Sequence, residues 1–106
     1  MAKKKAITNK SFAFNKKEIV LAEFANAISH PAKLEIIKFL SKNGGNMMGE
    51  IANEMPIASS TVFQHMEGLV KAKLVLIKKE NGAYNQYYLN KKELARFKKA
   101  FNIFFV

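Results

Sequence analysis

The change of hydrophobic period at residue 74 constrains the fold of this chain most strongly. From residue 59 to about residue 73, apolar residues recur at the three- and four-residue spacing of one helix face. These residues are Val62, Met66, Leu69 and Val70. Residues 74–77 then have strand character, and Asn81 and Gly82 are a strong signal for a tight type I′ turn. Residues 74–89 are therefore expected to form a β-hairpin directly after an amphipathic helix.

Helical spacing before residue 59 predicts three more helices. The first is expected from about residue 16 to 28, and Pro31 suits the first position of the second. The apolar face of the second helix is expected to consist of Leu34, Ile37 and Leu40, joined by Ile36. The residues of a short third helix that should face inward are Ile51, Ala52 and Met55. With a last helix from Lys91, the predicted fold is mainly α with a small β-hairpin, in the order α-α-α-α-β-β-α.

Polar residues at the expected helix starts predict how those starts are capped. The tetrapeptide Asn-Lys-Lys-Glu occurs at residues 15–18 and 90–93, where asparagine can accept from first-turn amides and glutamate can reach back. Asn46 is expected to cap the third helix and Ser59 the fourth. Between these two helices, residues 56–58 predict a turn of about three to four residues.

The net charge is +10, from 18 lysines and arginines against 8 acidic residues. Such an excess favours a polyanionic partner, either nucleic acid or an anionic membrane surface. The 106 residues suffice for one domain, expected at residues 15–106 behind a basic arm at residues 1–14. Because Arg96 is the only arginine, contacts to phosphate would fall to lysines, which are point charges.

Several function classes are excluded by what the sequence lacks. Cysteine is absent, so disulfides and thiolate metal sites are excluded. Aspartate is absent too, and no carboxylate and histidine are paired at a catalytic spacing, so an enzyme is not expected. The start lacks a signal peptide, and no apolar run reaches membrane-spanning length. A cytoplasmic protein without a membrane partner or a cofactor is expected.

The helix expected from residue 59 presents a polar face opposite its apolar stripe. At about 100° per residue, the side chains that point away from the stripe are those of Ser60, Gln64, Glu67 and Lys71. Thr61 and His65 lie on one flank, and Phe63 lies on the other. Hydroxyl and amide side chains read base edges, and Phe63 can meet a thymine methyl group. Residues 47–73 therefore predict a DNA-binding helix-turn-helix, with hairpin lysines on the flanking phosphates.

Residues 24–40 and 50–75 resemble the ArsR-type (arsenic-repressor-like) bacterial winged-helix repressors. The strongest match is Ser60-Thr-Val-x-x-His65, followed by Leu74-Val75 leading into the hairpin. The resemblance implies a winged helix-turn-helix repressor that binds an imperfect inverted repeat in double-stranded DNA. The DNA-reading positions that it implies are Ser59, Ser60, Thr61, Gln64 and His65. The wing positions that it implies are Lys78, Lys79 and Asn81.

The last helix carries apolar residues at spacings of three, four and three, as does a helix that packs on another helix. The resemblance implies a homodimer built from the first and last helices. The residues expected at this dimer interface are Leu21, Phe24, Leu94, Phe97, Phe101, Phe104 and Phe105.

The chain departs from the metal-sensing members of this family. Where they carry Cys-x-Cys, this sequence has Met47, Met48 and Gly49. His30 and His65 lie on different elements without a neighbour at ligand spacing, so no metal site is expected. His30 also replaces the aspartate that usually precedes the proline, and a weaker helix cap is expected there. The sequence does not indicate which effector, if any, the protein senses.

Two alternatives remain open at this point. An exposed Phe63 is also typical of an interface anchor, which would suit a winged-helix module that binds a protein instead of specific DNA. His65 is either a pH-sensitive contact to a base or a flank residue that orients the helix by hydrogen bonding.

Overall fold

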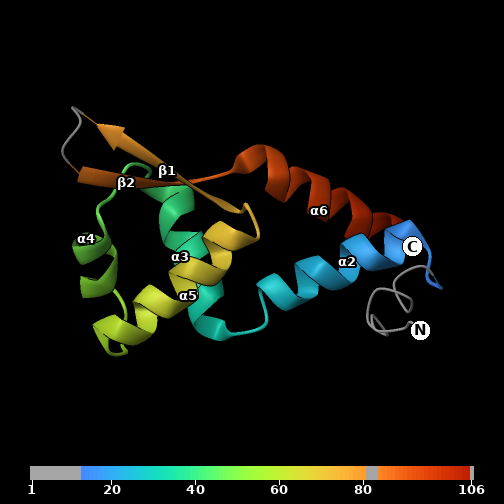
Figure 1. The fold of residues 1–106 in the computed structure, drawn as a ribbon, viewed down its shortest axis with the longest axis horizontal. Coiled ribbons are helices and arrows are strands. Elements are labelled where there is room, and N and C mark those ends of the chain that lie inside the picture. The colour runs from blue at the N-terminus through green and yellow to red at the C-terminus, as the bar shows by residue number, and fades with distance from the viewer. Residues whose placement is uncertain (1–12, 81–83, 106) are drawn as a thin grey trace, which may run out of the picture.

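The structure, a computed structural model, describes residues 13–80 and 84–105. Its elements follow the predicted order of helices and strands (Figure 1). They are α2 (Lys16–Ala27), α3 (Pro31–Lys42), α4 (Met48–Asn53), α5 (Ser59–Lys71), β1 (Val75–Glu80), β2 (Tyr84–Leu89) and α6 (Lys91–Phe104). The mainly helical fold with a two-stranded antiparallel hairpin is thereby confirmed. The basic arm expected before residue 13 and the predicted wing residue Asn81 lie outside the described residues.

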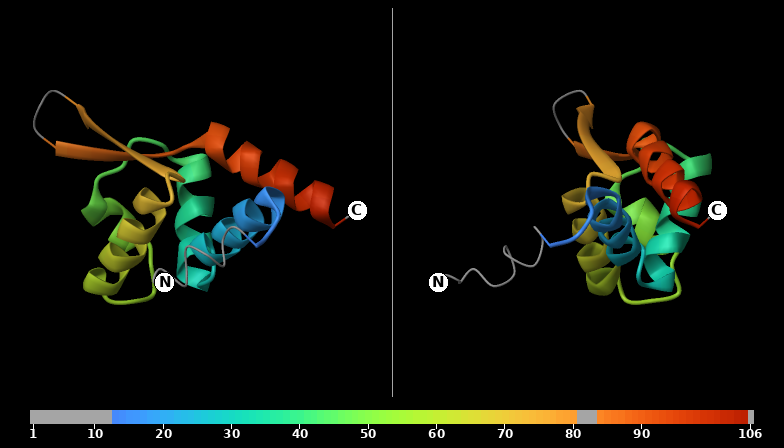
Figure 2. Two further views of the ribbon diagram at one scale, coloured as in Figure 1. Left: turned by 45° about the vertical axis from the view of Figure 1, so that its right-hand side comes forward. Right: turned by 90° about the vertical axis from the view of Figure 1, so that its right-hand side faces the viewer.

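Two parts of the molecule differ in shape. Helices α3, α4 and α5 pack together with the hairpin, whereas α2 and α6 run side by side away from them (Figures 1 and 2). The molecule is therefore elongated, with extents of 46 × 35 × 29 Å. None of the described helices is long and apolar enough to cross a bilayer.

The core lies between α3, α4, α5 and the hairpin. Its most deeply buried side chains are those of Ile36, Ile51, Val62, Met66, Leu69, Leu74 and Val75. The predicted stripe of α5 is thus confirmed, with Val70 half-buried at its edge. In the hairpin, Val75 pairs with Leu89 at the base and Lys79 with Asn85 near the tip. Asn46 adds a backbone bridge to Tyr87, which ties the segment before α4 to β2.

The predicted inward face of α3 was partly wrong. The buried residues are Ala32, Ile36 and Leu40, while Leu34 is 49% exposed. Leu34 lies two residues from both Ala32 and Ile36, about 200° around the helix. The packing partners of α3 therefore select the line of residues spaced by four and leave Leu34 in solvent.

The predicted caps of α2 and α6 are confirmed, with one difference between the two Asn-Lys-Lys-Glu tetrapeptides. The Asn15 Oδ1 accepts from the Lys17 amide at 2.8 Å, and the Glu18 carboxylate accepts from the Asn15 amide at 3.3 Å. The Asn90 Oδ1 accepts from the Glu93 amide at 3.2 Å. Glu93, however, pairs with Arg96 instead of reaching back, because the Asn90 amide already donates to the Leu74 carbonyl.

The predicted caps of α4 and α5 were wrong. Met47 occupies the N-cap position of α4, because the backbone of Asn46 is committed to β2. Ala58 occupies the N-cap position of α5 and makes no side-chain hydrogen bond, so Ser59 is the first helical residue. The turn spans residues 54–58 and is longer than the expected three to four residues.

Candidate nucleic-acid interface

The helix-turn-helix consists of α4, the turn at residues 54–58, and α5. We define the reading face as Ser59, Ser60, Thr61, Gln64 and His65. Ser59, Ser60 and Gln64 are exposed, and Thr61 and His65 are half-buried. All belong to the N-terminal half of α5, and the stripe of Val62, Met66 and Leu69 anchors them to the core. The five predicted residues therefore all lie in the first two turns of α5, with Ser59 and Ser60 toward α4 and His65 toward His30.

The first turn of α5 is open to an external hydrogen-bond acceptor. Ala58 has no side-chain oxygen to accept from the first amides of the helix. Amides at a helix start carry partial positive charge and favour an anionic partner. An anion at this end of α5 would have the hydroxyls of Ser59 and Ser60 beside it.

The two predicted wing lysines lie on opposite faces of the hairpin. Side chains alternate along a strand, so adjacent residues of β1 point to opposite sides. The ammonium group of Lys78 lies 4.9 Å from the ring centroid of Tyr88. Lys79 shares the other face with Ile77, which lines a cavity against α5. Lys79 is therefore the wing lysine on the same side as the reading face.

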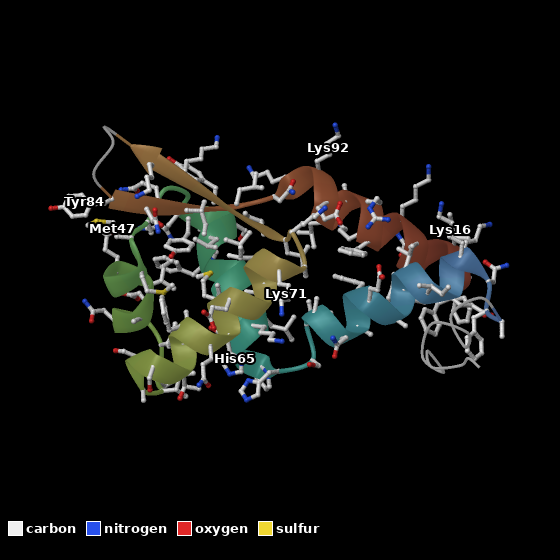
Figure 3. The ribbon with its side chains drawn as sticks, in the orientation of Figure 1. Lys16, Met47, His65, Lys71, Tyr84 and Lys92 are labelled. Carbon is white, nitrogen blue, oxygen red and sulfur yellow. The ribbon has the colours of Figure 1, made fainter. Side chains whose placement is uncertain are left out.

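Phe63 and Lys71 are the two other predicted site residues of α5. Phe63 is 48% exposed and separates two hollows, one of about 740 Å³ toward the hairpin and one of about 320 Å³ toward α4. Lys71 lies at the opposite end of the helix, about 16 Å along its axis from Ser60. Figure 3 shows its side chain beside the space between α5 and the pair α2 and α6. Lys71 lines the hollow toward the hairpin together with Phe63 and Gln64, and it also lines the cavity where α5 meets α2 and α6.

One contact at this site was missed from the sequence, because it joins separate elements. The rings of His30 and His65 lie 4.2 Å apart between centroids and are tilted by 35°. The His30 Nδ1 accepts from the Ala32 amide at 3.0 Å, so histidine caps α3 in place of aspartate. Burial lowers the pKa of His65, and the neighbouring His30 and Lys33 lower it further. The ring of His65 thus joins α5 to the start of α3.

Acidification is expected to destabilise the fold through His65. Its folded-state pKa lies below the ordinary value of 6.5, so the unfolded chain binds the proton more readily. The free energy of unfolding should therefore fall as the pH drops from about 6.5 toward the lowered pKa of His65. Denaturant titrations between pH 7.5 and 5 measure this slope. His65→Gln should flatten it, and an unchanged slope in that variant would contradict the assignment.

The predicted dimer residues divide into a buried pair and an exposed group. Phe24 and Phe97 are 9% and 2% exposed, and their rings stack at 4.8 Å within one chain. These two side chains are therefore buried beneath the exposed apolar residues of α6. Leu21 and Leu94 are half-buried. Phe101, Phe104 and Phe105 are 47%, 49% and 62% exposed. They line an almost wholly apolar hollow of about 310 Å³ with Leu21 and Ile28 of the α2 segment.

Known proteins with the same architecture are transcriptional regulators. The chain is 35% identical over 68 residues to an HTH-type transcriptional regulator of Methanocaldococcus jannaschii, covering 64% of this chain and 75% of the relative. A possible transcriptional regulator for arsenical resistance superposes with a TM-score of 0.66 at 25% identity, covering 76% of this chain and 82% of that one. This chain belongs to the HTH-type transcriptional regulators. No protein-family model matches it.

Two further solved structures share the fold of this HTH-type regulator. An ArsR-like regulator from Rhodococcus sp. RHA1 superposes with a TM-score of 0.72 at 21% identity, over 82% of this chain and 80% of that one. The transcriptional repressor BigR from Xylella fastidiosa superposes with a TM-score of 0.64 at 22% identity, over 84% of this chain and 90% of that one. Both are transcriptional regulators, and at this level of identity they establish the shared fold.

This HTH-type regulator lacks the cysteine ligands that the resemblance to metal sensors would require. At the start of α4, where those ligands are expected, the chain carries Met47 and Met48. Within residues 13–80 and 84–105, no three metal-ligating histidine or carboxylate side chains gather. The His30 and His65 rings contact each other in a tilted arrangement, and the His30 Nδ1 accepts from the Ala32 amide.

Proposed function

We propose that this regulator is a sequence-specific repressor that binds double-stranded DNA as a homodimer on an inverted repeat. The observation that carries the proposal is the exposed, uncapped start of α5. It presents Ser59, Ser60 and Gln64 on a rigid helix that the buried stripe anchors. Thr61 and His65 complete the reading face in the major groove, where glutamine can pair with adenine through two hydrogen bonds.

Lysines supply the contacts to the DNA backbone in this proposal. Lys79 lies on the side of the hairpin that faces α5, so it can reach a phosphate next to the bases that α5 contacts. Lys78 and Asn81 are the other wing residues proposed to contact phosphates. The basic arm at residues 1–14 adds charge beside the domain at residues 15–106, and the net charge of +10 favours association with DNA. Binding of chromosomal DNA places the protein in the cytoplasm.

The proposed dimer forms through the exposed part of α2 and α6. The ring of Phe105 contacts those of Phe101 and Phe104, with centroids 4.8 and 5.0 Å apart. A contiguous apolar surface of this kind marks an interaction site. A second copy is its proposed occupant, because a two-fold axis through this surface gives two reading faces for the two halves of an inverted repeat.

A second candidate function is a module that binds a protein partner instead of specific DNA. Exposed Phe63 and Ile77, which line the same cavity, favour it. Under that function, a stoichiometric protein complex would form through Phe63, and DNA binding would be weak and equal for all sequences. Phe63 also suits the first proposal, because it can meet a thymine methyl group.

Two substitutions separate base reading from backbone binding. Gln64→Ala should reduce the preference for the selected duplex over random duplex by about 5- to 150-fold, because one bidentate pair discriminates by about 1–3 kcal/mol. Lys79→Ala should weaken both duplexes alike and lower the salt dependence of binding. Both are measured by titration at several salt concentrations.

The control is Lys78→Ala, which removes the same charge from the other face of the hairpin. It should change binding less than Lys79→Ala does. If Gln64→Ala weakens selected and random duplexes equally, then α5 does not read bases and the proposal is wrong.

A further inference from the structure

A polar cavity of about 520 Å³ lies where α2, α5 and α6 meet, away from the reading face. Its charged lining consists of Lys33, Lys71, Lys73 and Arg96 with Glu23 and Glu93. Four cations against two carboxylates leave an excess of two positive charges. The cavity is therefore suited to an anion, and its volume is in the range of small-molecule sites.

Lysines account for this excess of positive charge. Arg96 and Glu93 neutralise each other through two hydrogen bonds of 3.2 and 2.9 Å. Among the described residues, Lys38 with Glu35 forms the other ion pair. The ammonium groups of Lys33, Lys71 and Lys73 therefore have no carboxylate within ion-pair distance in the part of the chain that the structure describes.

Lys73 occupies a backbone position that favours glycine. Its φ is +65°, and it ends α5 with two hydrogen bonds, from its own amide to the Val70 carbonyl and from the Leu74 amide to the Leu69 carbonyl. The Asn90 Nδ2 donates to the Lys73 carbonyl at 2.9 Å, which holds the position. A lysine at this point keeps a cation beside the cavity at a conformational cost that glycine would avoid.

Gly68 makes room for a second cation. It lies in the interior of α5, where glycine is unfavourable for a helix. A Cβ atom there would lie 3.3 Å from the Lys33 Nζ and 3.5 Å from its Cε. The missing side chain thus lets the ammonium group of Lys33 approach the helix next to the cavity.

We propose that this cavity binds a phosphorylated small molecule, and that its occupancy is the signal that changes DNA binding. Lysine ammonium groups are suited to phosphate as point charges. The cavity joins the C-terminal end of α5 to α2 and α6, so a ligand there contacts both the DNA-reading helix and the proposed dimer helices. The regulatory part rests on the proposed function, whereas the binding itself does not.

The cavity remains accessible in the proposed dimer. Glu23 and Asn26 of α2 line it, whereas Leu21 and Ile28 line the apolar hollow on the other side of that helix. At about 100° per residue, Glu23 and Ile28 are separated by about 140° around the helix axis. A partner seated on the apolar surface therefore leaves the cationic side open.

The test is calorimetric titration of the full chain with inorganic pyrophosphate, without DNA and at constant ionic strength. Saturable binding of one pyrophosphate per chain is expected. Lys33→Gln and Lys73→Gly should each weaken it at least tenfold. Lys73→Gly suits the positive φ, so a folded protein is expected. The matched control is Lys42→Gln on the same helix as Lys33, and it should leave the affinity unchanged.

Three results would overturn the proposal. Equal weakening by Lys42→Gln, or no saturation, would show diffuse attraction by net charge. If Lys33→Gln and Lys73→Gly weaken random duplex as much as pyrophosphate, these lysines contact the DNA backbone instead. If saturating pyrophosphate leaves the affinity for the selected duplex unchanged, the site has no regulatory role. Pyrophosphate binding without any duplex preference would instead show that the proposed DNA function fails.

Discussion

Phe101→Glu is expected to convert the regulator into a monomer and to lower its affinity for an inverted-repeat duplex by about 10²- to 10⁴-fold. Phe101 is 47% exposed, and its ring lies 4.8 Å from that of Phe105 on the apolar surface of α6. A carboxylate there would be buried without a partner on association, and two like charges would meet across the axis. Loss of the dimer removes the gain from binding two half-sites at once.

Sedimentation or light scattering gives the mass, and titration of the same samples gives the affinity. Ile103→Glu is the matched control, because Ile103 is 46% exposed and lies about 200° around α6 from Phe101. That variant should keep both the dimer mass and the affinity. A dimer that persists in Phe101→Glu, with unchanged affinity, would rule out this surface as the interface.

Phe97→Ala is expected to lower the free energy of unfolding by about 3–5 kcal/mol. Phe97 is 2% exposed, and its ring stacks on that of Phe24 at 4.8 Å with 8° between the planes. This stack is the main buried aromatic contact that joins α6 to α2, and the Arg96 guanidinium lies 4.8 Å from the Phe97 ring centroid. Truncation leaves a cavity that two surface helices cannot close without moving apart.

Denaturant unfolding at low protein concentration measures this loss. Phe14→Ala is the control, because Phe14 is 58% exposed, and it should change stability by no more than about 0.5 kcal/mol. A loss below about 1 kcal/mol in Phe97→Ala would show that α2 and α6 are held together by other contacts.

The order of elements was predictable because each element carries its own hydrophobic period. The exposure of Ser60 and Gln64 followed in the same way, since the buried stripe of α5 fixes the opposite face. The face of α3 was predicted less well, because only its packing partners decide between Leu34 and Ala32. The predicted cap of α4 by Asn46 was wrong because a contact distant in the sequence, the backbone bridge from Asn46 to Tyr87 of β2, holds this residue.

The sites that join distant segments were not predictable from local patterns. The His30 and His65 rings meet because α3 and α5 pack together, and no spacing in the sequence indicates it. The same holds for Lys33 and Lys73 around the cationic cavity. Phe97 and Phe101 follow one apolar pattern, and only the structure shows that the first is buried within the chain while the second is exposed.

The most direct test is titration of the unmodified protein on genomic DNA fragments at physiological salt. The protein is expected to select a small set of fragments that contain an inverted repeat, and two chains should bind each of them at least about 10³-fold more tightly than random duplex. Equal affinity for every fragment and for random duplex would contradict it.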